Sequence, residues 1–585
     1  MVAAGNVADW SSVPDDLVPQ ILTIARWPAS IVAVGVIIVA VARARRARSA
    51  DEAFAGKTGD RFVEDRSPSV ALAMVVAASL STVVTSYGWM RVLGREYRDG
   101  YQLVGGHRQL LGALIPPFLW TVAFSAASGL LGLLIVSVVV RRSATLASIR
   151  ASATAHVGGF FSAAILWRLW MALAIIPAKP DGGDPFYYHA TANLLVRGQG
   201  FLEPVRWTVL GIKNPGAVHG PLYPMVLALS SRVGGTSYFD HRVMAVLIGG
   251  LVVPAVYIVA NRVGGRRVAI VATCLAVVYP NLWSADGSLF VESMMAALTT
   301  LATYVAYRWI ETPRRRLMVL IGVLLGLAAL TRGEGILLVP ILVIPLVLVD
   351  KRLQLRQRWT QIAIGGLACL VTISPWMIYN ASRFEVFVPL STNSNEVLYY
   401  ANCPDVYSGR LIGFWSYDCQ VRHIAEFGEA PGDQAQQSEY WRSLAFHYVG
   451  DHLGQLPTVI AARVGRQWEV FRPYQTVDFS FIESRNRTSV EIGLIMYYLL
   501  MAGTLVSFWI LRRRGTRLMP LTSHFITVTL TAAYAYGTLR FRITVEPILC
   551  VGAAISAVAL VDRLAASRHQ HVELPADRTT DEPVV

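Results

Sequence analysis

Long apolar stretches alternate with short polar ones along most of this chain. A membrane-spanning helix needs about 20 consecutive apolar residues, and thirteen stretches meet or approach that length. The pattern therefore predicts an all-α polytopic membrane protein with about 13 transmembrane helices. The predicted spans are residues 21–41, 70–92, 113–140, 155–178, 241–260, 267–283, 292–310, 317–331, 336–349, 360–379, 490–511, 518–537 and 545–563.

Two polar segments interrupt this pattern. Residues 181–224 are rich in Gly, Pro and aromatic side chains and follow the fourth predicted span. Residues 380–489 are too long and too rich in Trp, Tyr and Pro for a disordered linker, so we expect a small folded cap. The resulting division is 1–150 for additional amino-terminal helices, 151–379 for a membrane core whose first external loop is 181–224, 380–489 for the cap, 490–565 for the final helices and 566–585 for a disordered tail.

Charge orients these segments. Hydrophobic residues make up 54% of the chain and charged residues only 15%, yet the formal net charge is +14. Most of the cations fall in alternate short loops, as expected for loops that stay in the cytoplasm. This distribution argues for membrane topology and against nucleic-acid binding. It places both polar segments on the extracytoplasmic face of the plasma membrane and the carboxyl-terminal tail inside. No cleavable signal peptide is expected, because residues 1–25 lack its charge pattern.

Five cysteines accompany this topology. Cys274, Cys369 and Cys550 lie in predicted spans and are expected to be core residues. Cys403 and Cys419 share the 380–489 segment. If that segment faces an oxidising compartment, these two form a disulfide candidate.

The outer loops collect carboxylates and arginines at the ends of spans, where a charge is unfavourable unless it is paired or hydrated. Asp184 is expected at the membrane surface, near enough to meet a lipid. Arginine has a planar fork of donors that matches phosphate oxygens, so Arg332, Arg540 and Arg542 together could hold a phosphate carried on a lipid. The alternative is interfacial snorkelling or salt bridging, for example between Arg332 and Glu334.

Metal binding is the weaker hypothesis. His189 and His219 lack tight ligand spacing with any carboxylate, and a lone histidine among aromatic residues is more often an ordinary hydrogen-bonding residue. The sequence therefore predicts no cofactor. A divalent metal is not favoured.

These residues lie in motifs that resemble a known family. The stretch DPFYYH at 184–189, GQGF at 198–201 and AVHGPLYP at 217–224 are similar to the first external loop of membrane glycosyltransferases with the GT-C fold that use lipid-linked sugars. The likeness is to the group of protein O-mannosyltransferases and lipid A aminoarabinose transferases. Glu292, LTRGE at 330–334 and RFR at 540–542 agree with it, so the resemblance covers roughly residues 155–565.

The resemblance implies roles for individual residues. Asp184 matches the family's catalytic aspartate. Pro185 follows it where many relatives have Glu, which argues against a site that uses two adjacent carboxylates. Glu292 matches the acidic residue of the second external loop. Arg332 matches the cationic position that meets the lipid phosphate in the family. Arg540 and Arg542 match the basic pair that precedes the last span, and we expect them to join Arg332 at the donor phosphate. The substrate-binding candidates of the first loop are Tyr188, His189, His219 and Tyr223.

The implied reaction is transfer of a sugar from a polyprenyl-phosphate donor to an acceptor hydroxyl on a glycan, lipid or protein, with membrane lipid around the site. Asp184 is the predicted general base, and departure of the phosphate opposite the attacking hydroxyl predicts inversion at the anomeric carbon. One role for Glu292 is to orient the acceptor or Asp184. The alternative is that it is only a carboxylate at the start of a helix, where the helix dipole favours a negative charge. Tyr188 either stacks on sugar or anchors the loop at the interface.

Two other functions share several of these features. A transporter or flippase of lipid-linked sugars would have similar spans and basic clusters, but it should show inverted repeats and ionisable groups near the midplane. This chain has its charges at span ends. A non-catalytic scaffold could use residues 380–489 as a binding module, and nothing in the sequence excludes it.

Overall fold

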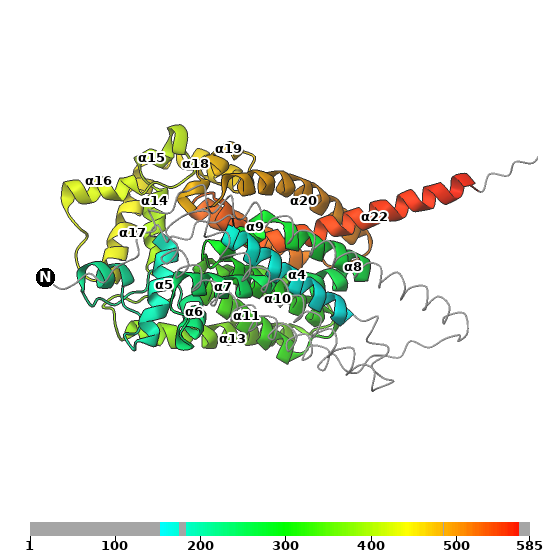
Figure 1. The fold of residues 1–585 in the computed structure, drawn as a ribbon, viewed down its shortest axis with the longest axis horizontal. Helices are drawn as coiled ribbons and strands as arrows, with labels where there is room; N and C mark the ends of the chain where they lie inside the picture. Colours follow the sequence, from blue (N-terminus) through cyan, green and yellow to red (C-terminus); the bar gives the residue numbers. More distant parts are fainter. Residues whose placement is uncertain (1–152, 175–182, 484, 573–585) are drawn as a thin grey trace, which may run out of the picture.

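A computed structural model of the protein describes residues 153–174, 183–483 and 485–572. Throughout these ranges the structure is helical and contains no strand (Figure 1). An isolated antiparallel bridge pairs Leu202 with Pro215. The three predicted spans within residues 1–150 lie outside the described residues.

The helices before residue 382 form most of a bundle. One of them, α8 (Val252–Val278), is divided by a break at Gly265, which has a φ of 78° and a ψ of 178°. The break falls in the polar loop between the predicted spans 241–260 and 267–283. The elements are α4 (Ala153–Ala174), α5 (Gly183–Val196), η4 (Arg206–Leu210), α6 (Leu222–Arg232), α7 (Tyr238–Gly250), α8 (Val252–Val278), α9 (Pro280–Gly287), α10 (Glu292–Glu311), α11 (Arg315–Thr331), η5 (Gly333–Leu337), η6 (Val339–Val343), α12 (Ile344–Leu348) and α13 (Leu355–Ala381).

The 380–489 segment folds into short helices that gather at the end of the bundle near α5 and α6 (Figure 1). These are α14 (Asn393–Ala401), α15 (Pro404–Tyr407), η7 (Gly409–Leu411), α16 (Asp418–Phe427), α17 (Gln434–Asp451), α18 (Leu456–Gln467), α19 (Pro473–Asp478) and η8 (Ser480–Glu483). The chain then returns to the bundle through α20 (Arg487–Arg513), α21 (Met519–Tyr534), η9 (Leu539–Thr544) and α22 (Glu546–Val572).

Apolar faces hold the bundle together. Helix α11 packs between α10 and α13, while α22 packs against α8 and α20. The largest core cluster joins α8, α9, α10, α20, α21 and α22 through buried side chains such as Tyr257, Leu282 and Ile548. A buried ion pair adds a polar tie: Arg168 of α4 donates to Asp286 of α9 across 2.6 Å, and neither side chain is exposed.

Each predicted span within the described residues overlaps a helix. Four helical stretches there are long and apolar enough to cross a membrane: Tyr238–Val278, Leu355–Ala381, Arg487–Arg513 and Glu546–Ser567. The protein is thus a mostly helical multi-pass membrane protein, as the alternation of apolar and polar stretches predicted.

Candidate active site

Four loop and helix-end positions, far apart in sequence, meet in one cluster. Asp184 is the second residue of α5, Glu292 begins α10, Arg332 follows the last residue of α11 and Arg540 lies in η9. All four were predicted site residues. Arg332 has an extended backbone, with a φ of −145° and a ψ of 129°, and this turns its side chain out of the line of α11.

Ion pairs connect these residues. Arg540 donates from Nη2 to Oδ2 of Asp184 across 2.6 Å and from Nε to Oε1 of Glu292 across 2.5 Å. Arg332 donates from Nη1 to the same Glu292 oxygen across 2.5 Å, and its Nε donates to Glu334. Glu292 therefore joins the two guanidinium groups, and Glu334 extends the cluster.

Aromatic rings cover the two guanidinium groups. The Cζ of Arg540 lies 4.4 Å from the ring centre of Phe290, and that of Arg332 lies 5.2 Å from Phe541. Such cation–π contacts hold a guanidinium in place without using its hydrogen-bond donors. Neither phenylalanine was singled out from the sequence. The available signal was position, since Phe290 precedes Glu292 by two residues and Phe541 lies between two arginines.

The first loop, residues 181–224, contacts Asp184 on the side away from Arg540. His219 approaches Asp184 from the other side, with its Nε2 3.2 Å from Oδ1. The His219 ring packs at 4.9 Å from both Tyr187 and Tyr188, and Tyr188 meets Tyr223 edge to face at 5.1 Å. The predicted substrate-binding residues Tyr188, His219 and Tyr223 therefore lie together beside Asp184.

Backbone contacts hold this loop in place. The bridge between Leu202 and Pro215 closes the loop, and Arg383 of the following segment donates to the carbonyl oxygen of Phe201 across 2.6 Å. Gly220 then passes very close to α11, since a Cβ at this position would lie 2.2 Å from the carbonyl oxygen of Leu330. Only glycine fits there without displacement, and this close approach brings His219 to Asp184.

The ion pairs shift the acidity of the cluster. Burial acts to raise the pKa of Asp184, but the charges of Arg540 and His219 and their hydrogen bonds outweigh it and hold that pKa well below its ordinary value. Burial acts to lower the pKa of Arg540, but Glu292 and Asp184 raise it well above its ordinary value. Asp184 is therefore a carboxylate at neutral pH, and Arg540 is a cation.

Several atoms of the cluster remain for a ligand. The ion pairs use Nε and Nη1 of Arg332 and Nε and Nη2 of Arg540, so each guanidinium keeps one nitrogen outside them. Oε2 of Glu292 and the hydroxyl of Tyr223 are buried without a hydrogen-bond partner. The side chain of Asp184 is 24% exposed, so its carboxylate is accessible to a substrate.

Two predicted site residues lie elsewhere. Arg542 is fully buried and pairs with Glu546 across 2.6 Å and with Glu469 across 3.5 Å. Side chains two positions apart in a 3₁₀ helix point about 120° apart, so Arg540 and Arg542 face different surroundings. His189 contacts His241, with 3.0 Å between their Nδ1 atoms, and not Asp184. In the part of the chain that the structure describes, no three His, Cys, Asp or Glu side chains form a group suited to a metal.

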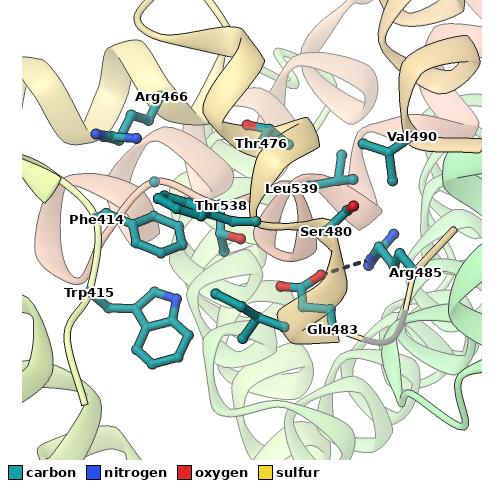
Figure 2. A pocket seen from close by; sticks show the side chains of 13 residues that line it. Phe414, Trp415, Arg466, Thr476, Ser480, Glu483, Arg485, Val490, Thr538 and Leu539 are labelled. Atoms are coloured by element: carbon teal, nitrogen blue, oxygen red, sulfur yellow. Dashed lines mark hydrogen bonds and ion pairs between the residues drawn. The ribbon is translucent and has the colours of Figure 1, made fainter. Parts of the chain in front are cut away.

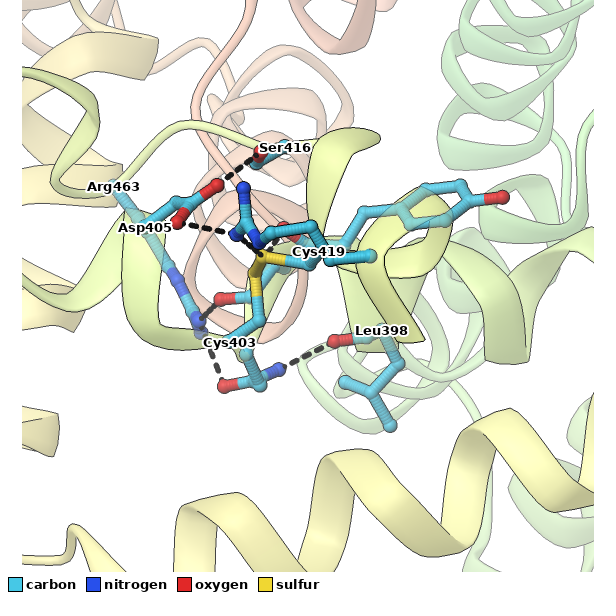
Figure 3. Close-up of a disulfide and its surroundings, with 10 residues drawn as sticks. Leu398, Cys403, Asp405, Ser416, Cys419 and Arg463 are labelled. Carbon is cyan, nitrogen blue, oxygen red and sulfur yellow. Dashed lines mark hydrogen bonds and ion pairs between the residues drawn. A yellow bond between two sulfur atoms is a disulfide. The ribbon is translucent and has the colours of Figure 1, made fainter. Parts of the chain in front are cut away.

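The 380–489 segment contains a disulfide between Cys403 and Cys419 (Figure 3), the pair singled out from the sequence. Polar contacts surround it. Arg463 of α18 donates to the carbonyl oxygen of Ala401 across 2.5 Å and to Oδ1 of Asn402 across 2.9 Å. The disulfide thus links α16 to the short turn that precedes α15, and Arg463 ties that turn to α18.

Comparison with known proteins points to one family. Residues 218–379 match the family model described as dolichyl-phosphate-mannose-protein mannosyltransferase. This stretch contains His219, Tyr223, Glu292 and Arg332, and the match confirms the resemblance inferred from the sequence motifs. A search of curated protein sequences found no match.

Among solved structures, the chain is similar to the oligosaccharyltransferase AglB from Archaeoglobus fulgidus in complex with an inhibitory peptide and a dolichol-phosphate, with a TM-score of 0.40, 13% identity and coverage of 72% of this chain and 53% of that chain. It is also similar to ArnT from Cupriavidus metallidurans bound to undecaprenyl phosphate, with a TM-score of 0.34, 17% identity and coverage of 71% and 81%. The chain thus spans about half of the length of AglB.

Proposed function

We propose that this protein is a membrane glycosyltransferase that moves a sugar from a polyprenyl-phosphate donor to the hydroxyl of an extracytoplasmic glycan, lipid or protein. The observation that carries the proposal is the contact between the carboxylate of Asp184 and the guanidinium of Arg540, next to Arg332. A base and an anion site thereby lie side by side, as transfer from a phosphate donor requires. The family match over residues 218–379 supports the same donor class.

The proposed topology has about 13 transmembrane helices with the site on the extracytoplasmic face. Residues 151–379 form the catalytic core, residues 380–489 the external cap and residues 490–565 the final helices. Residues 1–150 add further helices, and residues 566–585 form a cytoplasmic tail. The disulfide within residues 380–489 supports the external placement, because disulfides persist in oxidising compartments.

In the proposed reaction, the acceptor oxygen attacks the anomeric carbon of the donor sugar. The bond between that carbon and the phosphate oxygen breaks, and its electron pair leaves with the polyprenyl phosphate. The acceptor proton passes to Asp184 and later to solvent. Attack opposite to the leaving phosphate inverts the anomeric carbon. Because a carboxylate is a weak base, proton transfer is concerted with attack and contributes roughly 10²- to 10⁴-fold.

Arg332 and Arg540 stabilise the charge that grows on the leaving phosphate. The three carboxylates of Asp184, Glu292 and Glu334 surround these two guanidiniums. A bound phosphate competes for the same guanidiniums and weakens the hold of Arg540 on Asp184. The pKa of Asp184 then rises towards its ordinary value, which strengthens the base at the step that needs it.

The remaining residues position these groups. Glu292 holds both arginines through its ion pairs. Tyr188, His219 and Tyr223 form the wall against which the sugar lies, and His219 orients Asp184. The proposed chemistry uses no metal ion, since protein side chains supply both the base and the phosphate stabilisation.

The test is reconstitution of the purified full-length chain in liposomes with a polyprenyl-phosphate sugar and a glycan acceptor. Wild type should transfer sugar, and Asp184→Asn, which keeps the size of the side chain, should reduce turnover by about 10²- to 10⁴-fold. Donor binding should persist in this variant, because the arginines remain. Equal turnover in both proteins would refute the role of Asp184. Movement of the donor across the bilayer without transfer would instead support the flippase alternative.

A further inference from the structure

A pocket lies next to the catalytic cluster, between residues 414–415, the end of the 380–489 segment and residues 537–539 (Figure 2). Phe414, Trp415 and Phe479 contribute aromatic side chains, and Glu483, Arg485 and Thr538 contribute polar ones. None of the lining residues belongs to the first loop, so this pocket is separate from the wall formed by Tyr188, His219 and Tyr223.

Close backbone packing brings the two sides of the pocket together. The amide of Gly537 donates to the carbonyl oxygen of Gly413 across 3.1 Å. Both glycines press on α18: a Cβ at Gly413 would lie 2.7 Å from the backbone of Ala462, and one at Gly537 would lie 2.2 Å from the carbonyl oxygen of Arg463. The loop that carries Phe414 and Trp415 is therefore fixed against the loop that leads to Arg540.

Aromatic rings form one side of the pocket. Phe414 stacks on Trp415 with 5.6 Å between ring centres and an interplanar angle of 29°, and it lies 4.9 Å from Phe479. Tyr536 extends this group towards the catalytic cluster, since its ring lies 6.3 Å from Trp415 and 5.0 Å from Phe541. Phe541 itself covers Arg332. Contacts thus run continuously from the pocket to the proposed phosphate site.

The charged groups of the pocket already have hydrogen-bond partners within the protein. Arg485 donates to Glu483 across 2.7 Å and to Oγ of Ser284 across 3.0 Å, as the dashed line in Figure 2 shows for the first contact. The guanidinium of Arg466 donates to the carbonyl oxygens of Ile412 and Arg410 across 2.6 Å and 2.9 Å. A phosphate would have to displace these partners, so the pocket suits an uncharged ligand.

We infer that this pocket binds an uncharged sugar residue of a glycan acceptor; the inference rests on the proposed function and names its acceptor class. The C–H face of a sugar ring carries small positive partial charges and packs on the negative faces of aromatic rings. The sugar hydroxyls can hydrogen-bond to the carboxylate of Glu483, whose side chain is 17% exposed, and to the hydroxyls of Ser480 and Thr538.

The position of the pocket fits the acceptor rather than the donor. Leu539 lines the pocket and is followed directly by Arg540, so an acceptor sugar held here can extend a neighbouring residue towards Asp184. A lipid-linked donor has its tail in the bilayer, so it would have to reach Arg332 and Arg540 from the membrane. A single displacement requires the acceptor to approach from another direction, and the pocket in the 380–489 segment would provide it.

The first experiment measures saturation-transfer NMR of mannotetraose, an uncharged oligosaccharide, with the full-length protein in detergent. Wild type should give a signal that falls about tenfold in Trp415→Ala and in Glu483→Gln. The matched control is Phe446→Ala, which removes an aromatic side chain that is 56% exposed in the same segment and should leave the signal unchanged. Equal signals in all four proteins would overturn the inference, as would a signal from a threonine-rich peptide but none from mannotetraose.

The second experiment separates this inference from the proposed function. With a polyprenyl-phosphate sugar as donor, Trp415→Ala should raise the acceptor KM about tenfold and leave both the donor KM and the slow hydrolysis of the donor by water unchanged. An unchanged acceptor KM would overturn the acceptor pocket while the transferase assignment stands. Specific mannotetraose binding in a wild-type protein that never cleaves the donor would refute the transferase and leave the sugar pocket supported.

Discussion

Arg540 donates from its Nη2 to the Oδ2 of Asp184 across 2.6 Å, which joins two residues that are 356 positions apart in the chain. The cluster therefore forms only when η9, just before the last helix, packs against the start of α5. Arg540 also binds Glu292, so one guanidinium connects the proposed base to the acidic residue of the next loop. In the proposed mechanism, this shared position lets donor binding change the strength of the base.

The first prediction uses this contact to shift a pH profile. A pKa held below its ordinary value means that Asp184 stays ionised as pH falls, and activity is lost only when pH falls through that low pKa. Arg540→Gln removes the main charge that lowers the pKa, so the acid limb of kcat/KM should move to higher pH. The measurement is kcat/KM for sugar transfer between pH 4 and 8.

The control for this profile is Arg206→Gln. Arg206 pairs with Glu429 at the surface, and its side chain is 36% exposed, so loss of its charge should leave the acid limb unchanged. An acid limb that stays in place in Arg540→Gln would contradict the proposed electrostatic control of Asp184.

The second prediction separates the roles of Arg332 and Arg542. Arg332→Ala should raise the donor KM about tenfold or more and change the acceptor KM little, because it removes a group that binds phosphate. Arg542→Ala should instead lower the thermal stability, since it leaves the buried carboxylate of Glu546 without its cation, a change that typically costs about 3–5 kcal/mol. Kinetics at varied donor concentration and thermal unfolding in detergent distinguish the two effects. A larger donor effect in Arg542→Ala would reverse this assignment.

The sequence predicted the residues of the cluster but not how each side chain points. Alternation of spans was enough to place Asp184, Glu292, Arg332 and Arg540 on one face, because each lies at a span end. The angular position of each residue around its helix explains why His189 lies outside the cluster. In an α-helix, positions four apart share a face while positions five apart lie about 140° apart, so Tyr188 faces the same side as Asp184 and His189 turns away.

Long-range packing could not be read from the chain in the same way. Phe290 and Phe541 cover the guanidiniums only because Leu289 turns the chain with a φ of 58° before α10 and because η9 is a 3₁₀ helix. Hydrophobic periodicity carries no signal for either feature. The aromatic pocket likewise depends on two glycines that lie 124 positions apart, Gly413 and Gly537, which meet where both press against α18.

The third prediction concerns the close approach of the first loop to α11. Gly220→Ala places a Cβ only 2.2 Å from the carbonyl oxygen of Leu330, so the loop must shift and carry His219 away from Asp184. Turnover should fall about tenfold or more, as small misplacements of catalytic groups can do, and donor affinity should fall much less. Steady-state kinetics of sugar transfer test this.

The control for this substitution is Gly366→Ala in α13. Nothing lies within 4 Å of a Cβ at Gly366, and alanine favours a helix over glycine by about 1 kcal/mol. This variant should keep full turnover and unfold at the same or a slightly higher temperature. Full turnover in Gly220→Ala would show that the position of His219 does not matter to the reaction.

The fourth prediction follows from one guanidinium shared by two carboxylates. Glu546 lies 2.6 Å from Arg542 and Glu469 lies 3.5 Å from it, so Glu469 has the weaker ion pair with Arg542. Burial raises the pKa of Glu469 to about 7, against the opposing charge of Arg542. Its ordinary pKa in an unfolded chain is about 4.3, so the folded state holds the proton over a wide range in which the unfolded state has lost it. This contribution to stability is fully present below pH about 4 and is lost as pH rises to about 7.

Glu469→Gln removes that titration, because an amide stays neutral at every pH. The wild type should lose thermal stability as pH rises from 4 to 8, and Glu469→Gln should lose less. The loss of unfolding free energy between pH 4 and pH 8 should be larger in the wild type than in the variant, by the order of 3 kcal/mol. Glu429→Gln, at a side chain that is 72% exposed, should retain the wild-type slope. Unfolding temperatures in detergent at several pH values measure the effect. The same slope in wild type and Glu469→Gln would show that Glu469 ionises normally beside Arg542 and that Arg542 serves both carboxylates equally.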